Sequence, residues 1–442
     1  MLLALGIFIV TYAPLLFFPK IRAYIALASA CSFILIGILP GQDVFAAVDW
    51  NVLMMIAGTM GTVYLFIESR MPAKLADYII VKMPNVKWTI IALALFAGII
   101  SAFVDNVATV LMVAPIALTI AKKLKISPVP SIIAIAISSN LQGAATLVGD
   151  TTSILLGGYA KLNFLDFFFH MGKPGMFWVV QAGAVISALV LMVVFRKSSQ
   201  PIRLEEKTEV EDYFPSFLLL GTVLLLIVAS FLPDQETAVK AAEASGTAVG
   251  FYKPQTINGL ICMGFMVIGI LREMIRSKDW KAAFKVVKEI DYFTLLLLGG
   301  LFIVIKGIEQ AGVVREISNL FVSISNNNLF ITYTLIVWTS VLLSAFIDNI
   351  PYVLTMLPVA EQIAQGMGND PNVRILLFFG LLAGATLGGN LTPIGASANI
   401  TALGILRKEG YEVSNKEFMK ISVPFTLSAV ITGYLLVWLI WR

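Results

Sequence analysis

Residues 101–115 read SAFVDNVATVLMVAP, and residues 344–358 read SAFIDNIPYVLTMLP. The two stretches are nearly the same sequence, with Asp348 placed 243 residues after Asp105 and Asn349 placed 243 residues after Asn106. Each Asp lies in a run that is otherwise apolar enough to enter a lipid bilayer. An ionisable side chain is costly there and usually marks the path of a substrate or an ion. Two copies predict a duplicated fold, which is common among secondary transporters.

The composition indicates a membrane protein. Hydrophobic residues make up 58% of the chain and charged residues 13%, against about 45–50% and about 25% in soluble domains. The mean hydropathy is +0.89, and apolar runs near the length of a bilayer crossing recur along the chain. The net charge of +4 requires no nucleic-acid partner, because membrane topology explains the Lys and Arg residues. The two Cys residues lie in apolar runs, which argues against a disulfide framework or a metal site.

Ten apolar segments are predicted to cross the membrane: 2–18, 21–39, 51–68, 128–160, 175–195, 214–232, 256–272, 292–308, 373–406 and 421–441. Two further apolar segments, 88–121 and 329–366, carry an Asp-Asn pair at their middle. Each half of these segments has about 15 residues, which is short for a crossing at a rise of about 1.5 Å per residue. We therefore expect both to form re-entrant helical hairpins whose tips line a protein cavity near the membrane midplane.

The distribution of basic residues supports this topology. With ten spans and two hairpins, 23 of the 31 Lys and Arg residues fall on one side of the membrane, which the positive-inside rule places in the cytoplasm. Both termini are then expected outside the cytoplasm, and the compact loops fit a bacterial plasma membrane. Treating either hairpin as a single span would remove the asymmetry.

The topology divides the chain into two halves, residues 1–195 and 214–442, joined by a charged cytoplasmic linker at 196–213. Each half has an odd number of spans, so the halves are expected in opposite orientations. The predicted fold class is an all-α polytopic membrane protein with an inverted repeat. Each half is expected to contain five transmembrane helices, one re-entrant helical hairpin and one broken helix.

A second repeated motif follows each hairpin. Residues 140–153 read NLQGAATLVGDTTS, and residues 388–399 read GGNLTPIGASAN. Gly and Pro in a helix interior cost about 1 and about 3 kcal/mol relative to Ala, and Ser, Thr and Asn offer competing hydrogen bonds, so each helix should break there. A broken helix exposes carbonyls that coordinate Na⁺ and amides that hold anionic groups. The candidate ligands in these stretches include Asn140, Thr151, Thr152, Ser153 and Asn390.

The carboxylates are the candidate groups for ion coupling. Asp105 and Asp348, with the Asn that follows each, provide oxygen ligands for a cation or groups that bind a proton. Asp150 has no acidic counterpart, because Ala396 occupies the equivalent position, and this asymmetry makes Asp150 a third candidate for proton coupling or selectivity. Two alternatives remain open: the Asp residues could serve only as helix N-caps, and the small-residue stretches could be close packing surfaces.

The two SAFxDN hairpins, TLVGDTTS and GNLTPIGASAN together resemble the ion transporter superfamily, within it the arsenite-permease, NhaD and P-protein group with its citrate-transporter-like domain. The first-half motif of the P-protein branch usually reads TxIGDPPN, whereas Thr151, Thr152 and Ser153 stand here in place of Pro-Pro-Asn. The resemblance implies a homodimeric elevator-type transporter with a scaffold of residues 1–85 and 214–325 and a moving part of residues 86–195 and 326–442. It also implies a binding site from these residues: Asp105, Asn106, Asp348, Asn349, Thr146, Gly149, Asp150, Thr392, Gly395, Ser397 and Asn399.

The favoured function is a secondary transporter, coupled to H⁺ or Na⁺, for arsenite, a related oxyanion or a small organic anion. Because three acidic groups and no Lys or Arg lie in the motifs, a Na⁺/H⁺ antiporter is the main alternative. A passive anion channel also stays open, as does an intramembrane enzyme with an aspartyl dyad, although an inverted duplication disfavours an enzyme. No P-loop, zinc motif or catalytic triad stands out, so we expect no cofactor other than the coupling ion, and no metal site.

Overall fold

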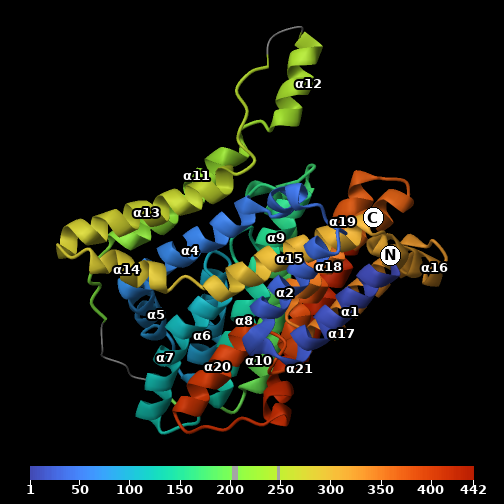
Figure 1. Ribbon diagram of the computed structural model, residues 1–442. Coiled ribbons are helices and arrows are strands. Elements are labelled where there is room, and N and C mark those ends of the chain that lie inside the picture. Colours follow the sequence, from blue (N-terminus) through green and yellow to red (C-terminus); the bar gives the residue numbers. More distant parts are fainter. Residues whose placement is uncertain (202–207, 246–248) are drawn as a thin grey trace.

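Side-chain caps set the starts of many helices in this chain. Asp49, Asn85 and Asp291 each accept a hydrogen bond from an amide in the first turn of the helix that follows. Such bonds satisfy amides that have no partner inside the helix. The computed structural model describes residues 1–201, 208–245 and 249–442, and most of this part is helical (Figure 1).

The helices of the first half are α1 (Leu2–Phe17), α2 (Arg22–Leu35), α3 (Val44–Ala47), α4 (Trp50–Glu68), α5 (Met71–Ile80), α6 (Val86–Ser101), α7 (Asn106–Leu124), α8 (Val129–Gly143), α9 (Thr151–Ala160) and α10 (Met176–Val194). Those of the second half are α11 (Phe214–Ser230), α12 (Gln235–Ser245), α13 (Ile257–Ser277), α14 (Lys281–Lys288), α15 (Tyr292–Gln310), α16 (Val313–Ile324), α17 (Leu329–Ser344), α18 (Asn349–Gly366), α19 (Pro371–Gly388), α20 (Ser397–Lys408) and α21 (Asn415–Trp441). Strands β1 (Phe169–His170) and β2 (Lys173–Pro174) pair antiparallel and are the departure from the predicted all-α class.

Among the described residues, eight helices are long and apolar enough to cross a membrane, or nine if α16 and α17, bent by 119°, form one span. The first two predicted spans are shorter than expected, because α1 and α2 have 16 and 14 residues. At about 1.5 Å per residue these helices measure roughly 24 and 21 Å, against a hydrocarbon core of about 30 Å. Gly37, with a φ of 77°, takes a left-handed conformation just after α2 and prevents the helix from continuing.

Each predicted hairpin segment forms two consecutive helices, α6–α7 and α17–α18, with its Asp-Asn pair at the turn between them. We call these pairs the first and second hairpin; their re-entrant path in the membrane stays a prediction. Their second arms are longer than the predicted 15 or so residues: α7 has 19 and α18 has 18. In α7 the helix continues beyond the apolar run through Lys122 and Lys123, where basic side chains favour a helix C-terminus. The predicted helix breaks are also present, between α8 and α9 and between α19 and α20.

Helices of the two halves pack against one another as closely as helices within each half do. Helix α2 packs against α15, and α4 against α13. A Cβ added to Gly58 of α4 would lie 2.4 Å from the Cys262 carbonyl carbon, and one added to Gly300 of α15 would lie 2.8 Å from the Ala26 carbonyl carbon. Since Gly300 follows Gly58 by 242 residues, the same close helix contact occurs in both halves.

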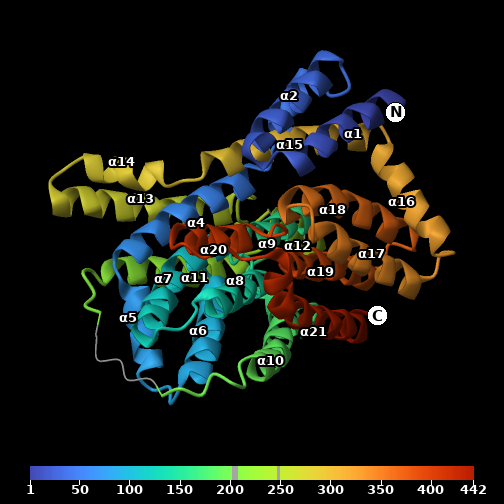
Figure 2. The ribbon, with the colours of Figure 1, turned by 90° about the horizontal axis from the view of Figure 1, so that it is seen from below.

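The hairpins and broken helices form the centre of the molecule. Helix α9 packs on α18, and α20 packs on α7 and α8, so the second arm of each broken helix contacts the hairpin of the other half. Helices α10 and α21 pack together at one edge, and α1, α2 and α15 lie together at the opposite edge (Figure 2). This arrangement brings both Asp-Asn pairs and both helix breaks to one region.

Both ends of the predicted linker form hydrogen bonds with the first half. Val86 N donates to Gln200 O at 3.0 Å, and Glu211 N donates to Ser69 O at 3.2 Å. Thr208 N donates to an Asp77 carboxylate oxygen at 2.8 Å. Residues 202–207 of the predicted linker lie outside the described part of the chain.

Candidate functional site

Each hairpin tip is an Asp that caps the helix after it. Asp105 Oδ2 accepts from Val107 N at 3.0 Å and from Ala108 N at 3.1 Å, and Asp348 Oδ1 accepts from Ile350 N at 3.1 Å. Asp150 caps α9 in the same way, because its Oδ1 accepts from the adjacent Thr151 amide at 2.8 Å. The capping role considered from the sequence is therefore present at all three positions. A carboxylate has about four acceptor sites, so capping leaves capacity for a cation.

The helix breaks are joined to the hairpin turns by the same contacts in both halves. Thr146 Oγ1 donates to Ala102 O, and Thr392 Oγ1 donates to Ala345 O. Gly149 and Gly395 sit where backbone approaches closely, since an added Cβ would lie 2.6 Å from a carbonyl oxygen in either case. These four repeated residues thus shape the break, and none of them lines the central cavity described below.

A buried hydrogen-bond network connects the first hairpin to the first break. Asn106 Nδ2 donates to Asn140 Oδ1 at 3.0 Å and to Asp150 Oδ1 at 3.3 Å. Thr152 Oγ1 donates to the other Asp150 oxygen at 2.8 Å, and Asn140 Nδ2 donates to Thr386 O of the second half at 2.8 Å. Asn140 is fully buried and Asp150 is 5% exposed. The network fixes the position of the Asp150 carboxylate.

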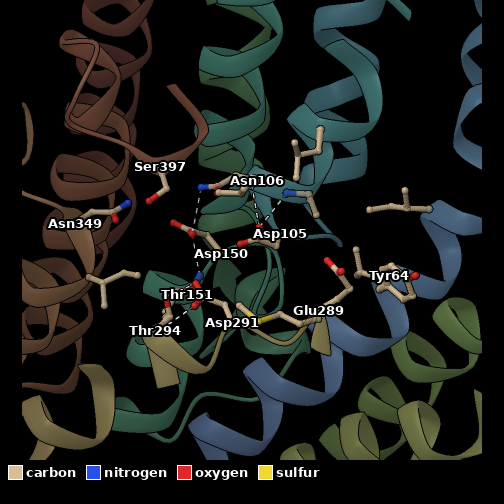
Figure 3. A pocket seen from close by; sticks show the side chains of 17 residues that line it. Tyr64, Asp105, Asn106, Asp150, Thr151, Glu289, Asp291, Thr294, Asn349 and Ser397 are labelled. Carbon is tan, nitrogen blue, oxygen red and sulfur yellow. Dashed lines mark hydrogen bonds between the residues drawn. The ribbon is translucent and has the colours of Figure 1, made fainter. Parts of the chain in front are cut away.

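A cavity of about 240 Å³ opens where the two hairpin tips and the two broken helices meet (Figure 3). The walls come from α4, α7, α9, α15, α18 and α20 and from the segment before α15. The lining residues are Met60, Val63, Tyr64, Ile67, Asp105, Asn106, Val107, Ala108, Leu111, Asp150, Thr151, Glu289, Asp291, Thr294, Asn349, Ile350 and Ser397. We call it the central cavity.

The central cavity is acidic. In the described part of the chain, its lining contains four carboxylates, those of Asp105, Asp150, Glu289 and Asp291, and no Lys or Arg. A cleft lined by charges of one sign concentrates ions of the opposite sign. The cavity therefore attracts cations, and an anion can enter it favourably only together with cations or at the positive ends of helices. Among the described residues, no three His, Cys, Asp or Glu side chains are grouped closely enough to hold a metal ion.

The carboxylate of Asp348 is paired with a cation, which the sequence motifs did not indicate. Arg22 Nη1 lies 2.6 Å from Asp348 Oδ2, and the two side chains are only 13% and 10% exposed. The motifs themselves contain no Lys or Arg, but Asp348 has a basic partner from outside them. Arg22 stands 326 residues away in sequence, at the start of α2 and outside both repeated motifs.

The predicted site residues fall into three groups. Asp105, Asn106, Asp150, Thr151, Asn349 and Ser397 line the central cavity. Asn140 and Thr152 contact that group through the network above. The remaining predicted residues lie behind the cavity wall, where their side chains or backbones are bonded to protein groups: Thr146, Gly149, Ser153, Asp348, Asn390, Thr392, Gly395 and Asn399.

Sequence reasoning missed the part of the cavity that comes from α4 and the start of α15. Asp291 and Glu289 add two of the four carboxylates, and Tyr64 adds an aromatic wall (Figure 3). One signal was available, because Asp291 follows Asp49 by 242 residues and both precede an aromatic residue. That spacing nearly matches the spacing of the hairpins and marks α4 and α15 as a further repeated pair.

A second, larger cavity of about 1200 Å³ lies between the other ends of α4 and α15. Five of its lining residues follow lining residues of the central cavity by 242 or 243 residues: Phe302, Ile305, Lys306, Glu309 and Leu354. The two cavities are therefore related by the repeat. Only the central cavity reaches the Asp-Asn tips. The described lining of the second cavity contains none of the four tip residues, Asp105, Asn106, Asp348 and Asn349.

Comparisons with known proteins agree with this architecture. A family model described as "Citrate transporter" matches residues 7–379. An uncharacterized transporter of Mycobacterium tuberculosis is 28% identical over 444 residues, covering 99% of this chain and 97% of the relative. The P protein of Homo sapiens is 26% identical over 479 residues, covering 93% of this chain and 56% of the relative.

Two solved structures share the fold. The YdaH transporter of Alcanivorax borkumensis matches with a TM-score of 0.59 at 13% identity, covering 89% of this chain and 86% of the other. MtrF of Neisseria gonorrhoeae, described as illuminating a class of antimetabolite efflux pumps, matches with a TM-score of 0.53 at 16% identity, covering 88% and 80%. At these identities the likeness concerns the fold alone.

Proposed function

Since this chain belongs to the citrate transporter family, we propose that it is an ion-coupled secondary active transporter for a small anion. The chain is an integral, multi-pass membrane transporter and not an enzyme, as its family and relatives indicate. The substrate class that we propose is a small organic anion, or arsenite or a related oxyanion, moved with H⁺ or Na⁺ across a bacterial plasma membrane.

The central cavity is the observation that supports this proposal most. It lies between the two hairpin tips, and residues that begin α9 and α20, Thr151 and Ser397, form part of its wall. Helix N-termini favour anionic groups. The volume of about 240 Å³ is below the usual range of about 300–1000 Å³ for drug-sized ligands, so it suits a small substrate.

Coupling to cations follows from the charge of the same cavity. Four carboxylates line it, and an anion brought among them meets strong repulsion unless their charge is reduced. We infer that H⁺ or Na⁺ binds at Asp105 and Asp150 before the anion does, and that this order couples the two fluxes. Asn106 Nδ2 lies 3.3 Å from Asp150 Oδ1. In our proposal this hydrogen bond changes when the cation binds to Asp150.

The two cavities support an elevator mechanism. In our proposal residues 86–195 and 326–442 move as one part against a scaffold of residues 1–85 and 214–325. The repeated glycine contacts between α4 and α13 and between α15 and α2 lie wholly inside the scaffold. The hairpin tips lie at the central cavity and away from its repeat-related counterpart, as expected for a carrier caught at one end of its movement. The inverted orientation of the halves and a homodimeric state belong to the same proposal.

The test is a flux measurement in proteoliposomes that contain a pH-sensitive dye. Pulses of citrate or arsenite are given with and without a Na⁺ or H⁺ gradient, for the unmodified protein and for Asp105→Asn. We expect substrate entry that requires the gradient and falls at least tenfold in the variant. Asp370→Asn, which changes another helix cap outside the cavity, should transport normally. Substrate flux that ignores both gradients would indicate a passive anion channel instead.

A Na⁺/H⁺ antiporter is the second candidate, and the absence of Lys and Arg from the described lining of the central cavity favours it. In that case a Na⁺ pulse alone should move protons, and Asp105→Asn and Asp348→Asn should each abolish the response. Intact antiport in both variants would exclude this candidate.

A further inference from the structure

The tip of the second hairpin is bonded to a positive charge that comes from outside the hairpin. Arg22 Nη1 lies 2.6 Å from Asp348 Oδ2, and Asp348 Oδ1 accepts the Ile350 amide at 3.1 Å. Both oxygens of this carboxylate therefore have a partner. The arginine and the aspartate are 13% and 10% exposed, so solvent screens their attraction only weakly.

The tip of the first hairpin has no such partner. Asp105 has the same capping bonds to its own helix, yet no Lys or Arg of the described chain forms an ion pair with it, and it faces the central cavity. Two carboxylates at equivalent positions thus stand in opposite electrostatic situations. A carboxylate shielded from water requires a compensating charge or a proton. Arg22 supplies that charge to the buried Asp348, whereas Asp105 is half-buried and faces the acidic central cavity.

Arg22 is held in place by its own neighbourhood. Its Nε donates to Leu15 O at 3.2 Å, across the turn between α1 and α2. One turn further along α18, Tyr12 of α1 donates to Pro351 O at 3.2 Å and contacts the Thr355 hydroxyl. The α1–α2 pair therefore contacts one face of α18 at successive turns, beginning at Asp348. These contacts join a part of the proposed scaffold to a part of the proposed moving unit.

We propose that Arg22 acts as an internal cation for Asp348. Arg22 forms an ion pair with the Asp348 carboxylate in the state seen here. When the second hairpin moves away from α2, a transported cation, Na⁺ or H⁺, binds to the carboxylate in its place. The exchange is balanced, because Asp348 keeps one positive partner or proton throughout and Arg22 keeps its own charge on the scaffold. This inference rests on the proposed ion-coupled transport. It adds that the two tips bind their cations in different states of the cycle.

Other charged groups near α18 are already paired, exposed or part of the cavity. Asp105, Asp150 and Asp291 line the central cavity, where Asp150 interacts electrostatically with Asp348. Two ion pairs account for most of the remaining charges on α18 and on the helices packed against it: Lys306 with Glu309 at 2.9 Å and Arg374 with Glu361 at 2.6 Å. The other charged side chains there are exposed, namely Lys161, Arg315 and Glu316. Arg22 is thus the cation that contacts Asp348.

The experiment measures thermal unfolding of the purified full-length protein in detergent, in Na⁺ against choline at equal ionic strength and over a series of pH values. For Arg22→Gln we expect an additional upward shift of the unfolding temperature with Na⁺, or with falling pH, because the freed Asp348 then binds that cation. Adding Asp348→Asn should abolish the additional shift. Arg22→Lys, which keeps the charge, should behave as the unmodified protein does.

Arg374→Gln is the matched control, because it breaks another ion pair of 2.6 Å made with α18. It should lower the unfolding temperature without changing its dependence on Na⁺ or pH. An Arg22→Gln protein with unaltered dependence on both cations would overturn the proposal. If that variant does not fold, Asp348→Asn alone decides, since it should keep the Na⁺ and pH dependence of the unmodified protein. Loss of that dependence would mean that Asp348 already binds a mobile cation.

This measurement needs no flux and no identified substrate. Failure of the proposed transport would appear as absent flux in the unmodified protein, whereas failure of the Arg22 proposal would appear only in the cation dependence of the variants.

Discussion

At the scale of the residue, three aspartates combine a structural and a chemical role. Asp105, Asp150 and Asp348 all cap helices, so each sits at a helix N-terminus that favours its negative charge. Two of them face the central cavity, and the third is paired with Arg22. The sequence predicted all three residues from their apolar surroundings and their repetition. It did not predict their different partners, since partner choice depends on contacts between distant helices.

Asn140 should be the most sensitive amide of the site. Its side chain bonds Asn106 and the Thr386 carbonyl, and it is fully buried. Asn140→Ala removes the bond to the Thr386 carbonyl and one of the two bonds of the Asn106 amide, which keeps Asp150 as a partner. A buried polar group that loses its partner costs roughly 1–3 kcal/mol. We expect a loss of stability in that range or above, measured by thermal unfolding in detergent. Asn319→Ala changes an exposed Asn of α16 and should leave the unfolding temperature unchanged.

The glycines of the two breaks give a second test at this scale. An Ala at Gly149 or Gly395 would place its Cβ 2.6 Å from a backbone carbonyl oxygen, so backbone has to shift. We expect Gly149→Ala and Gly395→Ala each to destabilise by about 1–3 kcal/mol or more and to reduce transport. Gly264→Ala, in α13 with nothing within 4 Å of the added Cβ, should be neutral or slightly stabilising. Unchanged unfolding of both break variants would contradict the tight backbone contact.

At the scale of the element, the repeat is most evident in the joint between hairpin and broken helix. The turn after α6 and the turn after α17 each offer a carbonyl to a threonine of the helix break that follows. Sequence patterns predicted the hairpins and breaks because both depend on local features, namely an Asp-Asn pair in an apolar run and clusters of Gly, Ser and Thr. The lengths of α1 and α2 were predicted less well, since apolar runs do not report where Gly37 or a turn ends a helix.

The threonine joints should contribute equally in the two halves. Thr146→Val and Thr392→Val keep the side-chain shape but leave the Ala102 or Ala345 carbonyl without its hydroxyl partner. We expect each to lower the free energy of unfolding by about 1–3 kcal/mol, by similar amounts, as measured by chemical or thermal denaturation. Thr119→Val, at an exposed hydroxyl that bonds only within α7, serves as the control. A large effect in only one half would show that the joints are not equivalent.

At the scale of the whole molecule, the two cavities lie at repeat-related places, but only one of them reaches the hairpin tips. The overall class, a mostly helical membrane protein, could be predicted from composition and apolar runs, and the division into two inverted halves stays a prediction from charge asymmetry and repetition. The contacts between α2 and α15 and between α4 and α13, and with them the position of Arg22 beside Asp348, could not be predicted. They join residues up to 326 positions apart, and no pattern within either segment identifies the other.

The cavities also provide a test of topology. Met60 lines the central cavity and Phe302, its repeat equivalent, lines the second one. In a background with Cys31 and Cys262 replaced by Ala, we expect Met60→Cys to react with a membrane-impermeant thiol reagent from the cytoplasmic side only. Phe302→Cys should react only from the other side. Labelling of both from the same side would contradict the assignment of basic loops to the cytoplasm.

The contacts between helices of the two halves have a consequence for folding during synthesis. When the ribosome has completed residues 1–195, α2 still lacks α15, α4 lacks α13, and the amide of Asn140 awaits a carbonyl 246 residues further on. The early half must therefore remain in the membrane, incompletely packed and with polar groups unpaired, until the late half is inserted beside it. We expect a chain truncated at the linker to be degraded faster than the full-length chain, because these contacts never form.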